Sequence, residues 1–485
     1  MIAVFWGGVK HRSRYAGLFR RKCPPWYDGI VCKTTRGRAE PMSEFLAGAA
    51  ERDITPEPGV PLWGYSDRTC AAEGVLDPLY ARSIVFRAAG GTVAMTALDL
   101  GRVPMRNACE RICSRAAAAG VDHVFLAATH THHAPVMEDE DAPYAVAIEN
   151  AIGACIEAAV ARLRPARIGL GRTEVDIAHN RRRIRQDGRC EMLWRNEARL
   201  PTAPVDREAA VIKIEREDGA PLGTLVHFAC HPVVMGPSNC LISADYVGEL
   251  TRIVREETGA PCLFFQGACG DLNPYLDKTP VDEGAVEAMR AVGREAARAV
   301  LVAWRETTVR APEAPSVAFS EQPVHVGTRW EADDAARALF REIHGDMFER
   351  YIDKLHPDLE VPLGVVVLNG NLGFVGIPGE VFVHYQLELK TISPLPDTFL
   401  CGYANDYHAY FPTVRDAAAG GYGGTVASYV GLGAADKLIS EGAIAVGRLA
   451  GRLRPCCTPE NFVILDALEA DTRVPSTRSQ PNSPL

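Results

Sequence analysis

The sequence predicts an α/β protein with mixed β-sheets flanked by helices in one large domain and a metal site at strand ends. Short apolar runs alternate with longer helical patterns, as in proteins that layer strands with helices. The 485 residues are 47% hydrophobic and 23% charged, a composition typical of a globular protein with a large core. Polar motifs rich in histidine, glycine and tyrosine follow several apolar runs, and α/β sheets bind ligands at the carboxyl ends of strands.

The expected strands are short apolar or alternating segments bounded by turn residues. In chain order they cover residues 83–87, 93–98, 124–128, 167–171, 209–215, 224–229, 262–265, 365–368 and 372–375. The sequence Asn369-Gly370-Asn371 separates the last two. An Asn-Gly pair between apolar runs predicts a tight hairpin turn.

The expected helices are longer alanine-rich or amphipathic segments with recognisable ends. They cover residues 105–119, 143–163, 246–258, 283–305, 380–390 and 438–453. Gly120 ends the first helix, Arg164-Pro165 closes the second, and Pro378-Gly379 precedes the fifth. The alternation of these helices with the strands predicts the layered fold.

The chain is expected to have three parts. Residues 1–43 form a basic leader, expected to be disordered or an extension that the gene model adds before a true start at Met42. Its apolar start precedes its basic cluster, which is the reverse of a secretory signal. Residues 44–460 form the globular domain. Residues 461–485 form a C-terminal tail, expected to be frayed after about Asp471.

Charge and cysteine usage restrict the partners and the compartment. The chain has 52 basic and 61 acidic residues, a net charge of −9, which argues against nucleic acid or an anionic membrane as a partner. No apolar run approaches the roughly 20 residues that span a membrane. The 14 cysteines are scattered without a CxxC pair. We therefore predict buried free thiols and a cytoplasmic location, with secretion as the alternative.

Histidines are concentrated directly after the expected strand 124–128, at His130, His132 and His133. On an extended backbone His130 and His132 point to one side and His133 to the other. Two imidazoles so placed can share a metal ion, or one can bind the metal while the other carries protons. The alternative is a polar turn whose histidines have only structural hydrogen bonds.

Three further motifs follow expected strands. His231 ends strand 224–229, whereas His227 lies ~13 Å earlier on the same strand face and is expected to pack in the core. The loop 267–270 before Asp271 is rich in glycine and alanine, and such a loop can aim N–H groups at an oxyanion. Glu380 begins the expected helix 380–390, where a carboxylate also simply suits the helix dipole.

A series of short motifs runs in order along the chain. They are Ala47-Gly48, Asp53-Ile54-Thr55-Pro56, Gly64-Tyr65, Leu79-Tyr80-Ala81-Arg82, Thr129-His130-Thr131-His132, Asn180-Arg181, His231-Pro232, Ser243-Ala244-Asp245-Tyr246, Gly270-Asp271, Pro378-Gly379-Glu380, and Ala404-Asn405 with Tyr407, Tyr410 and Tyr422. In this order they resemble the motifs of the neutral/alkaline (non-lysosomal) ceramidase family. An ordered set is far more specific than any single motif.

The resemblance implies an α/β catalytic domain over residues 44–460 that holds one zinc ion. Family members hydrolyse the amide of ceramide to sphingosine and fatty acid with a zinc-activated water. The implied zinc ligands are His130, His231, Glu380 and Tyr410. The implied catalytic residues are His132, Arg181 and Tyr422, and the implied substrate contacts are Gly64, Asp271 and Asn273. Mixed N/O ligands suit zinc, and His132 is suited to proton transfer.

Two departures from the family leave the substrate open. Asn273 stands where the family has a serine, and the family's carboxy-terminal β-sandwich domain has no counterpart after Tyr429. The first hypothesis is a zinc amidase of the ceramidase type, with a lipid or small-molecule amide as substrate. A lipid substrate would involve transient contact with a membrane surface. The alternatives are a zinc amidase for a smaller or more polar N-acyl substrate and a non-catalytic binding protein on the same fold.

Overall fold

The computed structural model describes residues 44–329, 338, 341–342, 356–425 and 427–454. Internal contacts divide the chain into Met1–Glu40 and Pro41–Leu485, and every described residue lies in the second unit. The expected leader (residues 1–43) and the expected tail (residues 461–485) lie outside the described residues.

An eight-stranded sheet forms the centre of this unit, in the order β13-β11-β10-β6-β1-β3-β4-β5. Its strands are β1 (Leu46–Asp53), β3 (Tyr80–Ala88), β4 (Gly91–Leu98), β5 (His123–Ala128), β6 (Arg164–Glu174), β10 (Glu208–Arg216), β11 (Pro221–Phe228) and β13 (Cys262–Gln266). The pairs β4–β5 and β11–β13 are parallel, whereas the other neighbours are antiparallel. The mixed sheet confirms the predicted fold class.

A second sheet has four strands in the order β15-β16-β17-β19. They are β15 (Val317–His325), β16 (Glu360–Leu368), β17 (Leu372–Gly376) and β19 (Asp397–Cys401). Asn369 and Gly370 have φ values of 53° and 64° between β16 and β17, which matches the left-handed pair of a type I′ turn. The predicted hairpin is therefore confirmed.

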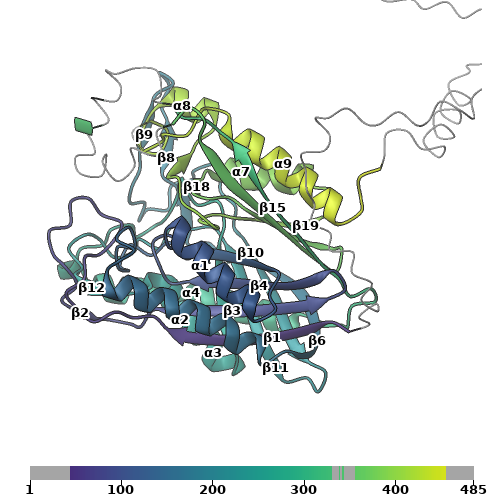
Figure 1. The fold of residues 1–485 in the computed structure, drawn as a ribbon. Coiled ribbons are helices and arrows are strands. Elements are labelled where there is room, and N and C mark those ends of the chain that lie inside the picture. Colours follow the sequence, from purple (N-terminus) through teal and green to yellow (C-terminus); the bar gives the residue numbers. More distant parts are fainter. Residues whose placement is uncertain (1–43, 330–337, 339–340, 343–355, 426, 455–485) are drawn as a thin grey trace, which may run out of the picture. The chain divides into compact units, whose positions relative to one another are not determined.

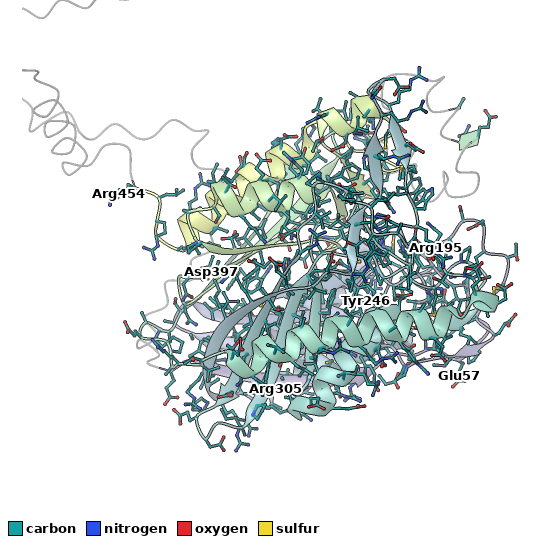
Figure 2. The ribbon with its side chains drawn as sticks, turned by 180° about the vertical axis from the view of Figure 1, so that it is seen from behind. Glu57, Arg195, Tyr246, Arg305, Asp397 and Arg454 are labelled. Atoms are coloured by element: carbon teal, nitrogen blue, oxygen red, sulfur yellow. A yellow bond between two sulfur atoms is a disulfide. The ribbon has the colours of Figure 1, made fainter. Side chains whose placement is uncertain are left out.

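The two sheets and their helices form four layers (Figure 1). The helices α1 (Arg106–Ala118), α2 (Pro143–Val160), α3 (Asp245–Thr258) and α4 (Ala285–Glu306) cover one face of the eight-stranded sheet. The four-stranded sheet covers its other face, and α7 (Val383–Ile392) and α9 (Ala434–Leu449) cover the outer face of the four-stranded sheet. Figure 2 shows the long helix α4, which ends near Arg305, lying across the strands.

Alternation along the strands explains why both faces of the large sheet are buried. On β5, Val124, Leu126 and Ala128 pack toward the helices, whereas Phe125 and Ala127 pack toward the second sheet. Side chains on a strand alternate between its faces. A strand between two apolar layers is therefore apolar throughout, which is why β5 appears in the sequence as a continuous apolar run.

Short elements complete the described part. They are β2 (Gly74–Val75) with β12 (Leu241–Ile242), β7 (Ala178–Asn180) with β14 (Leu272–Pro274), β8 (Arg182–Ile184) with β9 (Cys190–Met192), β18 (Glu380–Val381) with β20 (Tyr410–Phe411), the 3₁₀ turn η2 (Val281–Glu283), and α8 (Val414–Ala419). The expected helix 380–390 begins later than predicted, at Val383. Glu380 instead pairs with Tyr410 between two short strands.

The prediction that all cysteines are free thiols is wrong for one pair. Cys70 and Cys240 form a disulfide, although the eight other cysteines of the described part are free and most of them are buried. The two half-cystines are 170 residues apart, so no local spacing could indicate the bridge. None of the described helices is long and apolar enough to cross a membrane.

Candidate metal centre

Polar loops meet where strands of both sheets end. Gln266, the last residue of β13, donates a hydrogen bond through Nε2 to the carbonyl oxygen of Thr129 after β5, at 3.1 Å. The N–H of Gly402 after β19 donates to the oxygen of Gln266 at 2.9 Å. The N–H of Ala128 donates to Tyr403, also after β19, at 3.2 Å. These bonds join the ends of three strands, including the two edge strands of the large sheet.

His130 and His231 are held by backbone carbonyls. The Nδ1 of His130 donates to the oxygen of Gly101 at 2.6 Å, and the Nδ1 of His231 donates to the oxygen of Leu272 at 3.1 Å. Both rings are buried, with exposures of 0% and 1%. A carbonyl on one ring nitrogen fixes the tautomer and leaves the other nitrogen free as a ligand.

Both free nitrogens face one carboxylate oxygen of Glu380. The Nε2 of His231 lies 3.0 Å from Oε2 of Glu380, and the Nε2 of His130 lies 3.4 Å from the same atom. Burial by itself would raise the pKa of Glu380, but the two imidazoles lower it well below its usual range. Burial also lowers the pKa of His231 to about 4. The two imidazoles therefore favour the ionised form of the Glu380 carboxylate.

His132 joins this cluster, but not for the reason predicted from an extended backbone. The φ of His130 is 71°, so the segment turns through the left-handed region that non-glycine residues rarely adopt. The turn nevertheless brings Nε2 of His132 to 3.3 Å from Nε2 of His130. His132 is partly exposed. His133 points away, with its Nε2 3.4 Å from the oxygen of Gly236.

Tyr407, which is not among the site residues predicted from the sequence, contacts the centre directly. Its phenol donates to Oε1 of Glu380 at 2.6 Å, and the side chain is 4% exposed. Tyr410 lies beside Glu380 because the two residues are register partners between β18 and β20. The repeated tyrosines of the 403–410 loop were the available signal, but their spacing does not tell which of them faces the carboxylate.

Arg181 and Asn273 form part of the floor beside the centre. Arg181 donates through Nη2 to the phenol oxygen of Tyr410 at 3.0 Å and to the oxygen of Gly270 at 2.7 Å. Its Nη1 donates to Oδ1 of Asn273 at 3.1 Å. Asn273 in turn donates through Nδ2 to Oδ2 of Asp277 at 2.8 Å. Both ends of the Asn273 amide are therefore occupied by protein partners.

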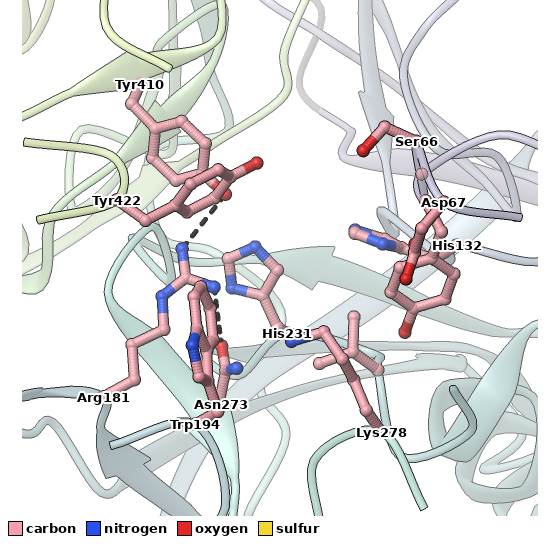
Figure 3. A pocket seen from close by; sticks show the side chains of 13 residues that line it. Ser66, Asp67, His132, Arg181, Trp194, His231, Asn273, Lys278, Tyr410 and Tyr422 are labelled. Carbon is pink, nitrogen blue, oxygen red and sulfur yellow. Dashed lines mark hydrogen bonds between the residues drawn. The ribbon is translucent and has the colours of Figure 1, made fainter. Parts of the chain in front are cut away.

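These groups open onto a pocket of about 360 Å³ (Figure 3). It is lined by Gly64, Tyr65, Ser66, Asp67, His132, Arg181, Trp194, His231, Val233, Asn273, Lys278, Tyr410 and Tyr422. Gly64 has φ 106°, and a Cβ on it would lie 2.4 Å from Cγ of His132. Tyr422 is 41% exposed.

Asp271 is the one expected substrate contact that does not line this pocket. Its Oδ2 accepts a hydrogen bond from Asn180 at 2.7 Å, and its Oδ1 accepts one from the N–H of Val383 at 2.8 Å. The carboxylate therefore fixes the loop after β13 to the start of α7. His227 packs in the core as predicted, with its Nε2 donating to the oxygen of Leu400 at 2.6 Å.

The converging atoms fit a zinc ion. With Nδ1–H of His231 given to a carbonyl, its Nε2 directs a lone pair at an ionised oxygen 3.0 Å away. Two acceptors at this distance come together when a proton or a metal ion lies between them. His130, His132 and His231 offer ring nitrogens within 4.8 Å of one another. Two nitrogens with carboxylate and phenol oxygens form the mixed set that zinc accepts.

Part of the chain is similar to a known family. Residues 45–276 match the model of the family described as neutral/alkaline non-lysosomal ceramidase, N-terminal. A neutral ceramidase of Pseudomonas aeruginosa is 27% identical over 259 residues, which cover 49% of this chain and 38% of that protein. The chain therefore matches well under half the length of this relative.

Solved structures share the fold. The crystal structure of neutral ceramidase from Pseudomonas aeruginosa superposes with a TM-score of 0.67 at 20% identity, covering 85% of this chain and 75% of that one. A second structure, of a ceramidase complexed with C2, superposes with a TM-score of 0.66 at 20% identity, covering 86% and 76% of the two chains. This likeness confirms the α/β architecture predicted from the sequence.

Proposed function

We propose that this chain, whose residues 45–276 belong to the neutral/alkaline non-lysosomal ceramidase family, is a zinc-dependent hydrolase of an amide bond. The family supplies the reaction class, a hydrolase. The zinc dependence and the substrate are our own proposals. The observation that carries the zinc is the pair of carbonyl-anchored imidazoles whose free nitrogens face one oxygen of Glu380.

His130, His231 and Glu380 would hold the ion, with Tyr410 as a fourth ligand. When bound, zinc supplies a Lewis acid for the amide carbonyl and lowers the pKa of a water to near 7. Arg181 supports the fourth ligand because it donates a hydrogen bond to the Tyr410 oxygen. The oxygen keeps a lone pair for the metal. Tyr407 supports Glu380 in the same way.

His132 would move the proton. Its Nε2 lies beside the metal-facing nitrogen of His130, and its ring is partly exposed to the pocket. Burial, together with the neighbouring imidazoles, lowers its pKa well below the usual value, so the ring is neutral and can accept a proton from the attacking water. Nε2 would then return this proton to the leaving amine. Water is thereby added across the C–N bond, giving a carboxylic acid and an amine.

Tyr422 and Gly64 complete the proposed site. The Tyr422 phenol stands at the exposed side of the pocket, with its ring 5.4 Å from that of Tyr410. It would donate to the carbonyl oxygen as negative charge develops there. Gly64 leaves space beside His132 that any side chain would fill, so a substrate can approach the imidazole closely.

Ceramide is the first candidate substrate, but one observation favours a smaller or more polar N-acyl amine. Both ends of the Asn273 amide are bonded to Arg181 and Asp277. Asn273 is therefore held in one orientation by protein partners, at the position where the family has a serine. A panel of short- and long-chain ceramides beside small polar N-acyl amines tests this choice, and faster turnover of long-chain ceramide would reject the second candidate.

Metal analysis tests the zinc centre. Plasma mass spectrometry of purified protein should give about one zinc per chain, and the His231→Ala variant should lose it. A His227→Ala variant is the matched control. This buried histidine lies on β11, four residues before His231 and outside the centre, so the metal content should stay unchanged. Wild-type protein without stoichiometric metal after zinc addition would contradict the proposal and favour a binding protein on the same fold.

The compartment can be tested through the disulfide. The sequence predicts the cytoplasm with secretion as the alternative, and disulfides such as Cys70–Cys240 persist mainly in oxidising compartments. The bridge therefore favours the alternative. Mass spectrometry of unreduced peptides from the native source decides between the two, because a cytoplasmic protein should carry both thiols reduced.

A further inference from the structure

One charged side chain of the pocket has no part in the proposed reaction. Lys278 lines the pocket beside Trp194 and Asn273. We propose that Lys278 binds a carboxylate on the amine half of the substrate, so that the enzyme acts on N-acylated amino acids or similar N-acyl amines with an anionic group. The inference rests on the proposed function and names the substrate class of that same site.

The backbone holds Lys278 in a fixed position. Its φ is 51°, a conformation that a side chain adopts only where the surroundings impose it. Its N–H donates to the oxygen of Val233 at 2.8 Å, and the N–H of Thr279 donates to Val234 at 2.8 Å. Backbone hydrogen bonds from Lys278 and from the next residue therefore fix this strained position against the segment just after His231.

The ammonium group is aimed into the pocket. Nζ of Lys278 lies 4.0 Å from the centre of the Trp194 ring. Figure 3 shows the side chain entering from the side opposite Arg181. The side chain is 35% exposed, whereas its partner Asp277 is 0% exposed. Nζ has three N–H donors, and one of them bonds to Oδ2 of Asp277 at 3.1 Å. The aromatic face and the carboxylate orient the ammonium and leave donors for a ligand.

Hydrogen bonds connect this lysine with the metal centre. Lys278 donates to Asp277, Asn273 donates to Asp277, Arg181 donates to Asn273, and Arg181 donates to Tyr410. The Asn273 amide links the two ends of this chain, because its oxygen accepts from Arg181 and its nitrogen donates to Asp277. A substrate bound at Lys278 and at the metal would therefore lie along one rigid floor.

The position of the charges favours an anion at Lys278, although the two cations of the pocket are balanced in number by the carboxylates of Asp67 and Asp277. Among its lining residues, Arg181 and Lys278 are cations, and Asp67 is the carboxylate, exposed to solvent. The buried carboxylate of Asp277, which does not line the pocket, neutralises the charge of Lys278. A bound zinc would add further positive charge. A carboxylate suits a lysine better than a hydroxyl does, because a charge-assisted hydrogen bond is roughly twice as strong as a neutral one.

Two short amides that differ in one group test the inference. N-hexanoylglycine carries a carboxylate, and N-hexanoylethanolamine carries a hydroxyl in its place. We expect kcat/KM for the glycine compound to be about 10- to 100-fold higher, and Lys278→Met to remove most of this preference. Lys278→Arg should retain part of it. Lys278→Met should lower kcat/KM for the glycine compound by a much larger factor than for the ethanolamine compound.

Lys213→Met is the matched control for the loss of a lysine. Lys213 also lies 4.0 Å from a tryptophan ring, that of Trp304, and 2.9 Å from a carboxylate, that of Glu215, but on β10. This variant should keep the preference for the carboxylate. Equal kcat/KM values for both compounds in the wild type, or an unchanged preference in Lys278→Met, would overturn the inference.

A binding measurement separates this inference from the proposed function. Calorimetry on metal-free protein should show N-hexanoylglycine binding at least about 10-fold more tightly than the ethanolamide, and Lys278→Met should abolish the difference. If neither amide is hydrolysed while this difference is present, the hydrolase proposal fails and the anion site stands. If hydrolysis occurs but the two bind equally, the anion site fails alone.

Discussion

The Tyr407→Phe substitution tests whether the hydrogen bond to Glu380 supports metal binding. It removes one phenol oxygen from a side chain that is 4% exposed and leaves the ring in place. The lost bond, 2.6 Å long, ends on a buried carboxylate, and bonds to charged groups contribute about 1.5–3 kcal/mol. Because about 1.4 kcal/mol is a factor of ten, zinc should bind roughly 10- to 150-fold more weakly. Loss of a residue that hydrogen-bonds to a metal ligand has effects of this order in other metal sites.

Competition with a chromophoric chelator measures this affinity, and Tyr385→Phe provides the control. Tyr385 is 1% exposed and donates to Oδ2 of Asp436 at 2.7 Å, so its substitution also removes a phenol donor from a carboxylate. We expect Tyr385→Phe to lower the free energy of unfolding without changing zinc affinity. A Tyr407→Phe protein that binds zinc within about twofold of the wild type would refute the reasoning, because the bond then contributes nothing to metal binding.

Three further predictions concern stability and the pocket wall. Burial lowers the pKa of His227 to about 4, so its folded state excludes a proton that the unfolded state binds below about pH 6.5. The free energy of unfolding should therefore fall by about 3 kcal/mol as the pH drops from about 6.5 to 4, and urea titrations should show a smaller fall for His227→Gln. Gly64→Ala should lower kcat/KM at least about 10-fold with zinc content unchanged, because its Cβ meets the ring of His132. Ser substitution of Cys70 and Cys240, which close a loop of 170 residues, should cost about 2–5 kcal/mol of unfolding free energy. An unchanged denaturation midpoint would contradict this last prediction.

Local pattern was sufficient to find the principal polar motifs and nine strands of the two sheets, but it missed β1, β15 and β19. The apolar run before His130, the strand before His231 and the Asn369-Gly370 turn are each contained in about ten residues of sequence, and period-two alternation or turn chemistry is fixed at that range. The helices α1 and α2 were also within a few residues of their predicted bounds. The start of α7 was predicted too early because Glu380 suits a helix start but pairs with Tyr410 instead.

Local sequence pattern did not predict the roles of individual side chains, because these depend on residues far apart in the chain. The sequence predicted that His130 and His132 lie together because side chains alternate along an extended strand. His130 instead takes a left-handed φ, so the two rings meet through a turn of the backbone. Asp271 was expected to contact substrate, but its carboxylate bonds to Asn180 and Val383. A loop sequence rich in glycine shows that the backbone can approach a ligand. It does not show which way the following carboxylate points.

The sequence by itself determined that this chain layers strands with helices and that His130, His231 and Glu380 follow strands. These properties depend on hydrophobic periodicity and turn chemistry, which act between residues a few positions apart. The tertiary structure decided which atoms face one another. The Nδ1 bond of His130 to Gly101 and the bond of Tyr407 to Glu380 span 29 and 27 residues, and that of His231 to Leu272 spans 41. Backbone carbonyls carry no signature in the sequence, and side-chain direction depends on how distant segments pack, so only the folded chain specifies the centre.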